Sequence, residues 1–336
     1  MNELPPVSVI IPMYNAEKFI AELLESLLIQ TLKNFEVIIV DDCSTDESFK
    51  IVESYLVKFG GRLQLMKLPT NSGGPSIPRN KGLELSRGKY IFFADNDDVI
   101  LENTLEDLYN FAENFQVDVV HCEKYFISSG IGDDFKKNIK IVADTAAISD
   151  VENIMSDDMI YRANIWLQRK FGVMPWRFML ARNFLIKSEI KFRDLKREDV
   201  FWSFEVLFSA PKILRVTNPY CIHRVDRNSM TERNKTLEKY LGYWMDRTVN
   251  GLKALEDFMM KIPFFAKNPA VKFTMLSHWA MSDLNLISNA CANFEPYILK
   301  EVFQKVFSKD LGDQDALVAV LFANSVRLIN ESKKKN

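Results

Sequence analysis

The chain has 336 residues, of which 47% are hydrophobic and 26% carry a charge. A chain of this length and composition has enough apolar residues to form one large or two ordinary globular domains. The formal net charge is −2, so the chain lacks the basic excess that binding to nucleic acid requires. We therefore expect no nucleic-acid partner.

The four cysteines are far apart in the sequence and form no C-x-x-C pair, which argues against a zinc site or a disulfide framework. A reducing cytoplasm is therefore the expected compartment. Residues 1–11 lack the pattern of a signal peptide, and no run of about 18 apolar residues would span a membrane.

The first 120 residues alternate between strand-like and helix-like segments. Short apolar and β-branched runs predict five strands, at residues 7–11, 35–40, 63–68, 89–94 and 117–121. The segments between them have apolar residues at helical spacing, as in residues 16–30. Strands that alternate with helices are typical of an α/β fold, with a mostly parallel central sheet flanked by helices.

The rest of the chain is less regular. Residues 123–190 give mixed signals, and residues 199–210 predict an amphipathic helix. From about residue 237 the pattern is helical, with breaks at Pro263, Pro269 and Pro296. We therefore expect a C-terminal helical region at residues 236–336. Its apolar stripes are typical of a core, and a subunit contact in a homo-oligomer or peripheral docking on the inner face of the cell membrane are the alternatives.

Polar clusters follow four of the predicted strands, where open parallel sheets bind their ligands. The most informative cluster is Asp95-Asn96-Asp97-Asp98. In an extended segment, carboxylates two residues apart point to the same side, so Asp95 and Asp97 are placed to share one Mn²⁺ or Mg²⁺ with the diphosphate of a nucleotide. The alternative is a simple turn. In either case we expect Asp98 to cap the next helix.

Two further clusters suit a nucleotide. Asp41 ends the second strand, where its carboxylate can accept a hydrogen bond from a base or a ribose, although helix capping is the commoner use of such a residue. The loop from Asn71 to Arg79 contains two glycines, and Arg79 can pair with phosphate unless it is an ordinary surface arginine. No G-x-G-x-x-G or P-loop motif is present, so a cation is the expected partner of the diphosphate.

The later part of the chain offers a base and an acceptor contact. Glu198 and Asp199 open a predicted helix, whose dipole favours an ionised carboxylate that can accept a proton, or that simply complements the helix charge. His223 can add a nitrogen ligand to the cation or serve a structural role, and Arg224 can bind phosphate. Trp176 can stack on a sugar ring or belong to the core.

The order of these clusters resembles the family 2 glycosyltransferases, which have the GT-A fold of nucleotide-diphospho-sugar transferases. The resemblance is carried by the residue runs 7–15, 30–31, 35–46, 73–76, 79–82 and 88–98, and more loosely by Trp176, Glu198-Asp199, and His223-Arg224 with Ser229. Cys43, Ala94 and Asn96 stand where glycine, leucine and serine are frequent in that family. None of these departures removes a carboxylate.

The resemblance implies an inverting, metal-dependent enzyme of bacterial polysaccharide or glycoconjugate synthesis. It would move a sugar from a UDP-sugar to a hydroxyl of a saccharide or lipid-linked acceptor, with Asp199 as catalytic base beside Glu198. Asp97, Asp95 and His223 would hold Mn²⁺ or Mg²⁺, and Trp176 would contact the acceptor. The nucleotide-sugar would contact Pro12, Tyr14, Glu17, Asp41, Asn71, Arg79, Asp95 and Asn96.

The same resemblance implies a domain at residues 1–235, divided into a nucleotide-sugar half at 1–120 and an acceptor half at 121–235. Two other readings fit an α/β nucleotide domain. A nucleotidyltransferase that makes nucleotide-sugars would need a glycine-rich loop after the first strand, where the sequence instead has Pro12-Met13-Tyr14-Asn15. A non-catalytic nucleotide-binding module would not need intact acids at Asp95, Asp97 and Asp199.

Overall fold

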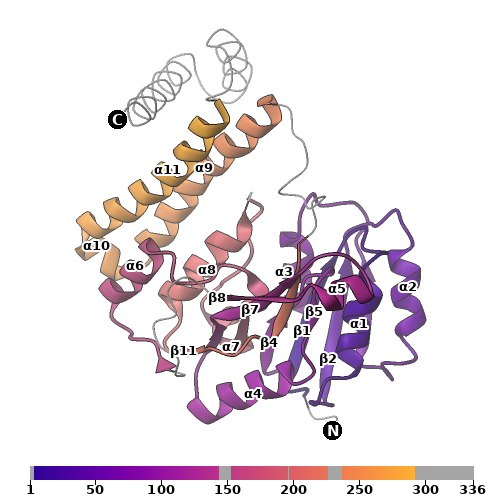
Figure 1. Cartoon of the computed structure of the whole chain (residues 1–336). Coiled ribbons are helices and arrows are strands. Elements are labelled where there is room, and N and C mark those ends of the chain that lie inside the picture. Colours follow the sequence, from indigo (N-terminus) through magenta and orange to yellow (C-terminus); the bar gives the residue numbers. More distant parts are fainter. Residues whose placement is uncertain (1–3, 144–152, 196, 226–236, 292–336) are drawn as a thin grey trace. The chain divides into compact units, whose positions relative to one another are not determined.

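The computed structural model describes residues 4–143, 153–195, 197–225 and 237–291 (Figure 1). The chain divides into two compact units, residues 1–194 with 198–229 and residues 195–197 with 230–336. The sequence places a domain boundary between residues 235 and 236, which lie outside the described residues. The two halves expected within residues 1–235 stay a prediction.

An eight-stranded sheet forms the centre of the first unit, in the order β3-β2-β1-β4-β10-β6-β11-β9. All five predicted strands are present, and β1, β2, β3 and β4 are parallel, as β6 and β11 are to each other. The antiparallel members are β9 and β10, and β10 pairs with both β4 and β6. The strands are β1 (Val7–Met13), β2 (Phe35–Asp41), β3 (Leu63–Lys67), β4 (Tyr90–Phe93), β6 (Val119–Cys122), β9 (Asn153–Ile154), β10 (Phe178–Ala181) and β11 (Ile213–Val216).

Helices cover both faces of this sheet, which explains why the residues of β1, β2, β4 and β6 are buried throughout. The odd-numbered residues of β1 share a core with α1 (Ile20–Leu28), α2 (Ser48–Tyr55) and α4 (Thr104–Phe115). On the opposite face, α3 (Ser76–Leu85) packs on β1, and α8 (Glu198–Ser209) brings Trp202 against Phe93 of β4 (Figure 1). The remaining helical segments of this unit are α5 (Asp133–Lys137), α6 (Met159–Leu167), η1 (Pro175–Arg177) and α7 (Arg182–Lys187).

One glycine shows how closely the sheet is packed. Gly88 lies against β1, where its backbone N–H donates to Ser8 Oγ at 2.8 Å. A Cβ atom at this position would lie 2.5 Å from the backbone nitrogen of Ser8. Because that neighbour is backbone and cannot move aside cheaply, the approach requires a residue without a side chain.

A second sheet, in the order β5-β12-β7-β8, was not expected from the sequence. Its strands are β5 (Val99–Ile100), β7 (Lys124–Ser128), β8 (Lys140–Ala143) and β12 (Cys221–Arg224). The pairing of β12 with β5 joins Cys221 to Ile100 and Ile222 to Val99. It therefore places His223 beside the acidic cluster that precedes β5.

The described part of the second unit is helical, as predicted. It contains α9 (Leu237–Met260), α10 (Pro263–Lys267) and α11 (Pro269–Cys291), so the breaks expected at Pro263 and Pro269 are confirmed, while Pro296 lies outside the described residues. Among the described residues, no helix is long and apolar enough to cross a membrane.

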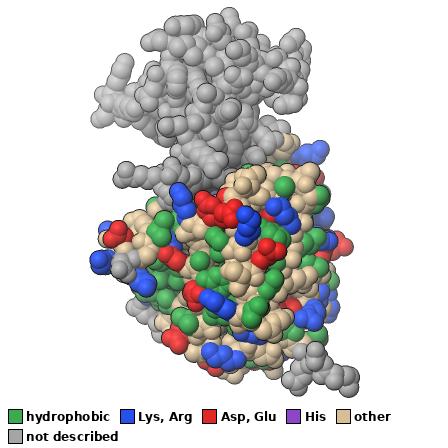
Figure 2. All heavy atoms as spheres, turned by 90° about the vertical axis from the view of Figure 1, so that its right-hand side faces the viewer, with side chains coloured by type: hydrophobic (Ala, Val, Ile, Leu, Met, Phe, Trp, Pro, Cys, Tyr) green, Lys and Arg blue, Asp and Glu red, His purple; other side chains and the backbone are tan. Residues whose placement is uncertain are grey.

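The surface on the α2 side of the first unit is mixed. Figure 2 shows acidic, basic and apolar side chains interspersed over this face. Such a surface matches the small net charge of the chain.

Candidate active site

The nucleotide-binding residues expected from the sequence gather beyond the ends of β1, β2 and β4. Asn96 donates from Nδ2 to the carbonyl oxygen of Pro12 at 3.0 Å, which ties the acidic loop after β4 to the end of β1. Tyr14, which follows β1, is 43% exposed. Glu17 accepts the backbone N–H of Glu47 at 3.2 Å. The segment that begins with Pro12 thus borders the acidic loop.

Asp41 and its neighbour hold the loop that follows β3. Asp41 is fully buried, and its carboxylate accepts the backbone N–H of Ser44 at 3.1 Å. Asp42 accepts the backbone N–H of Ser72 at 2.8 Å, and Asn71 donates to the carbonyl oxygen of Asp42 at 2.9 Å. The carboxylate of Asp41 therefore contacts the protein's own backbone in this structure, and Asn71 helps to hold its own loop against β2.

Arg79 joins the two acidic clusters. Its side chain is 5% exposed, and its guanidinium lies 2.8 Å from Asp95 Oδ1 and 2.8 Å from Glu198 Oε1. The same group lies over the ring of Phe192, 4.9 Å from the ring centre. Burial works to lower the pKa of Arg79, but the carboxylates of Asp95, Glu198 and Asp199 raise it above its ordinary value. Arg79 is thus a buried bridge between acids, and the surface position considered from the sequence is wrong.

The expectation that Asp98 caps a helix is also wrong. The next helix, α4, begins only at Thr104, because Val99 and Ile100 form β5. Asp98 is instead buried, with its Oδ1 atom 2.9 Å from His223 Nδ1 and 2.9 Å from the backbone nitrogen of Arg224, which donates to it. The carboxylate therefore fixes the orientation of the histidine ring through Nδ1, and Nε2 is the ring nitrogen that Asp98 does not contact.

Charge accumulates around Asp97. Burial, together with the neighbouring charges of Asp98 and Asp95, raises the pKa of Asp97 to about 7. For His223, burial opposes the charge, but the hydrogen bond and charge of Asp98 raise its pKa to about 9. The neighbouring carboxylates contribute to both shifts: their negative charge adds to the effect of burial at Asp97 and outweighs it at His223.

This environment suits a divalent cation. A histidine held by a carboxylate through one nitrogen is a common way to present the other nitrogen to a metal. Asp97 with Nε2 of His223 would supply one oxygen and one nitrogen ligand, a set that Mn²⁺ accepts. Among the described residues, no three His, Cys, Asp or Glu side chains could hold an ion by themselves. Cations that act with nucleotides take the remaining ligands from phosphate oxygens and water.

Trp176 does not present a free ring. It is 3% exposed, and its ring stacks on that of His223 with centres 5.3 Å apart. Tyr125 meets it edge-on at 5.0 Å. The expectation that Trp176 stacks on an acceptor sugar is therefore not met in this structure, since the ring is buried and supports His223 instead.

Arg224 has a role that sequence reasoning missed. Phosphate binding was the expectation, but its side chain is 1% exposed, and its Nε atom donates to the backbone oxygen of Asp97 at 2.8 Å. The same guanidinium donates to Gly130 and pairs with Glu22. Arg224 thus positions the acidic loop from behind. No local signal in the sequence pointed to this role, because Glu22, Asp97 and Gly130 are all more than 90 residues away in the chain.

Comparison with known proteins identifies the family. The model of glycosyl transferase family 2 matches residues 8–187, which is more than half of the chain. The poly(ribitol-phosphate) β-N-acetylglucosaminyltransferase TarS of Staphylococcus aureus is 47% identical over 115 residues, 34% of this chain and 20% of TarS. The uncharacterized glycosyltransferase EpsJ of Bacillus subtilis is 30% identical over 231 residues, 68% of this chain and 64% of EpsJ. The chain thus spans a fifth of TarS and just under two thirds of EpsJ.

Solved structures agree on the fold. A structure of Staphylococcus aureus TarS residues 1–349 in complex with UDP-GlcNAc has a TM-score of 0.67 and 23% identity, covering 98% of this chain and 91% of that one. The mannosyltransferase PcManGT of Pyrobaculum calidifontis, in complex with GDP-Man and Mn²⁺, has a TM-score of 0.53 and 17% identity, with coverages of 97% and 88%. The chain therefore belongs to glycosyl transferase family 2 and is a glycosyltransferase with the GT-A fold.

Proposed function

We propose that this glycosyltransferase moves a sugar from a UDP-sugar to a hydroxyl of a saccharide or lipid-linked acceptor, with a divalent cation and with inversion at the anomeric carbon. The observation that carries the proposal is the bridge made by Arg79. One guanidinium contacts both Asp95, which follows β4, and Glu198, which opens α8. The acidic loop expected to bind the donor and the start of the helix expected to carry the catalytic base are thus joined by one side chain.

The donor side of the proposal uses the acidic loop. Asp97 and His223 would hold Mn²⁺ or Mg²⁺, with Asp95 beside them, and Pro12, Tyr14, Glu17, Asp41, Asn71, Arg79 and Asn96 would surround the nucleotide. When bound, the cation would neutralise charge that develops on the departing diphosphate. A UDP-sugar is favoured as donor because the similar TarS fragment is known in complex with UDP-GlcNAc. UDP-GlcNAc is therefore the first donor to test.

The acceptor side uses the N-terminus of α8. Asp199 lies in the first turn of this helix, where the dipole stabilises an ionised carboxylate, and it is close enough to Arg79 to raise that residue's pKa. The acceptor hydroxyl would lose its proton to Asp199 as its oxygen bonds to the anomeric carbon. The bond from that carbon to UDP breaks on the opposite face, and its electron pair leaves with the diphosphate. An α-linked donor would then give a β-glycoside. Glu198 is already paired with Arg79, so its role would be to position the site and not to accept the proton.

The test is release of UDP from UDP-sugars in the presence of Mn²⁺, with the parent, Asp97→Asn, Asp199→Asn and an exposed control, Asp257→Asn. Loss of the base is expected to lower kcat about 10²- to 10⁴-fold with little change in donor KM. Asp97→Asn should abolish the response to Mn²⁺, and the control should match the parent. Full activity of both site variants would refute the proposed mechanism. Release of pyrophosphate in place of UDP would instead identify a nucleotidyltransferase.

The proposal extends to the cellular setting. We expect a cytoplasmic enzyme that associates loosely with the inner face of the cell membrane when its acceptor is lipid-linked. Flotation with anionic liposomes tests the association, and protein that stays with the soluble fraction would contradict it. Sedimentation velocity tests the homo-oligomer.

A further inference from the structure

The hydrogen bonds between α3 and the chain preceding α8 have no part in the roles assigned so far. Asn80 forms two of them with the backbone of Phe192: its Nδ2 atom donates to the carbonyl oxygen at 2.7 Å, and its Oδ1 atom accepts the N–H at 2.9 Å. Ser76 donates from Oγ to the carbonyl oxygen of Arg193 at 2.8 Å. Asn80 thus satisfies both backbone polar groups of Phe192, as a neighbouring strand would.

Phe192 and Arg193, the two residues whose backbone α3 anchors, both contact α8, the helix that carries Asp199. The ring of Phe192 stacks on that of Trp202 in α8, with centres 4.9 Å apart and planes 8° from parallel. The guanidinium of Arg193 pairs with Glu205 of α8. Trp202 lies one turn after Asp199 in the same helix. A displacement of Phe192 or Arg193 would therefore displace the helix that carries Asp199.

The same face of α3 also carries Arg79, since positions 76, 79 and 80 are three and four residues apart. Arg79 contacts Asp95 and Glu198, so this helix face touches both sides of the reaction. Arg79 binds charged groups of the site directly, whereas Ser76 and Asn80 contact only backbone that leads to it. The effect of Asn80 on the reaction must therefore pass through Phe192 and Arg193, which lead to α8 and, through the ring of Phe192, to Arg79.

We propose that Asn80, assisted by Ser76, is a positioning residue that sets the place of Asp199 through Phe192, Arg193 and α8. The proposal rests on the role of Asp199 as base. It predicts that loss of the anchor reduces the rate of the chemical step and leaves donor binding unchanged. Displacements near 1 Å of a catalytic group cost up to about 100-fold in rate.

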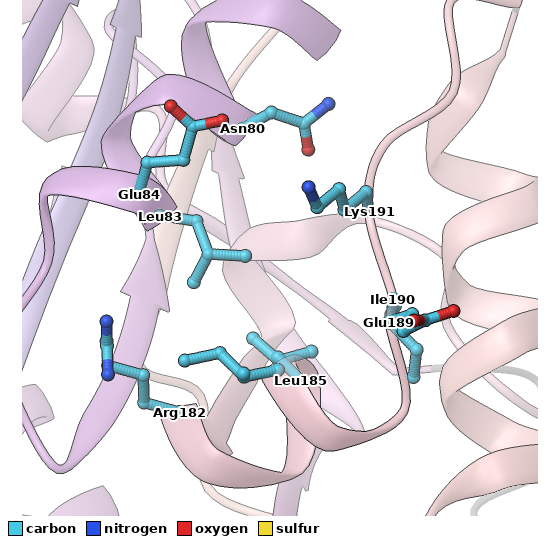
Figure 3. Close-up of a pocket in the computed structure, with 9 residues that line it drawn as sticks. Asn80, Leu83, Glu84, Arg182, Leu185, Glu189, Ile190 and Lys191 are labelled. Atoms are coloured by element: carbon cyan, nitrogen blue, oxygen red, sulfur yellow. The ribbon is translucent and has the colours of Figure 1, made fainter.

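A control is available on the same helix. Asn80 and Glu84 both line a cavity of about 600 Å³ between α3 and the segment 182–191 (Figure 3). Glu84 contacts Lys81 at the surface and none of the anchored backbone. Glu84→Ala therefore alters the same cavity and helix but leaves the anchor intact.

The experiment compares kcat, donor KM and calorimetric affinity for UDP with Mn²⁺ in Asn80→Ala, Ser76→Ala, Glu84→Ala and Asp199→Asn. We expect kcat to fall about 10- to 100-fold in Asn80→Ala and about 3- to 10-fold in Ser76→Ala, with donor KM and UDP affinity within about twofold of the parent. Glu84→Ala should match the parent. Hydrogen exchange at the amide of Phe192 should become faster in Asn80→Ala.

Three results would overturn the inference. An unchanged kcat in Asn80→Ala and Ser76→Ala, with Asp199→Asn inactive, removes the positioning role and leaves the proposed function standing. A fall in UDP affinity that matches the fall in kcat assigns Asn80 to the donor site instead. Full activity of Asp199→Asn refutes both proposals together. If Asn80→Ala does not fold, the milder Ser76→Ala decides the question by the same comparison.

Discussion

The buried bridge of Arg79 allows a quantitative prediction of stability. Replacing Arg79 by Met leaves the carboxylates of Asp95 and Glu198 without the guanidinium group that both contact at 2.8 Å. Removing one partner of a buried ion pair costs about 3–5 kcal/mol, because the remaining charge stays desolvated. Arg79→Lys should lower the free energy of unfolding by less, since an ammonium group can still pair with one of the two acids.

Lys81 provides the matched control, two residues away on the same helix. Its pair with Glu84 is exposed, with 37% and 55% of the two side chains accessible, so Lys81→Met should cost about 0–1 kcal/mol. The assay is urea denaturation of metal-free protein in low salt and in 0.5 M NaCl, a salt level at which screening acts within about 5 Å. The loss in Arg79→Met should persist in salt. A loss below about 1 kcal/mol, or one that salt removes, would refute the buried-bridge account.

Three further predictions follow from the site and the sheet. In metal-free protein with EDTA, Asp97→Asn should be more stable than the parent, because the pKa of Asp97 rises from 3.8 to about 7 on folding and its ionised form destabilises the folded state. The difference in unfolding free energy between variant and parent should grow between about pH 4 and pH 7 and reach at most about 4 kcal/mol in urea denaturation. A difference that shrinks as the pH rises would contradict this prediction. In the same metal-free state, Asp98→Asn should lower the pKa of His223 from about 9 toward its ordinary 6.5 in an NMR titration, and an unchanged value would exclude the pairing with Asp98 as its cause. Gly88→Ala should cost about 1–3 kcal/mol or more, since its Cβ would meet the backbone of β1, and Gly74→Ala, where nothing lies within 4 Å, should be neutral; equal melting temperatures for the two variants would show that the close approach is absent.

The parallel part of the fold was predictable because its signals are local. Each of the five expected strands is a short apolar run followed by polar residues, and each was found. The strand β10 was missed, since it joins the sheet through pairing with β4, about 90 residues earlier in the chain. The second sheet was missed for the same reason, because β12 pairs with β5 more than 100 residues away.

The same distinction explains the errors in the site. An aspartate before a predicted helix is a reasonable cap by local rules, but Asp98 precedes a strand that exists only through its distant partner. A surface position for Arg79 stayed open as the alternative to phosphate binding, because its two acidic partners are 16 and 119 residues away. The residue types of the site were readable from the sequence, whereas their pairing depends on long-range contacts. The roles proposed for Asp97, Asp199 and His223 stay predictions.

The antiparallel strand β10 has a consequence for how the protein is made. It lies between β4 and β6, so the central sheet is incomplete while the ribosome has produced the chain only as far as Cys122. Roughly 60 more residues must follow, which takes about 3–12 s at about 5–20 residues per second. During that interval the nascent chain exposes unpaired edges on both sides of the gap, which are surfaces prone to aggregation. A chaperone that binds nascent chains would have most effect on this protein in that window.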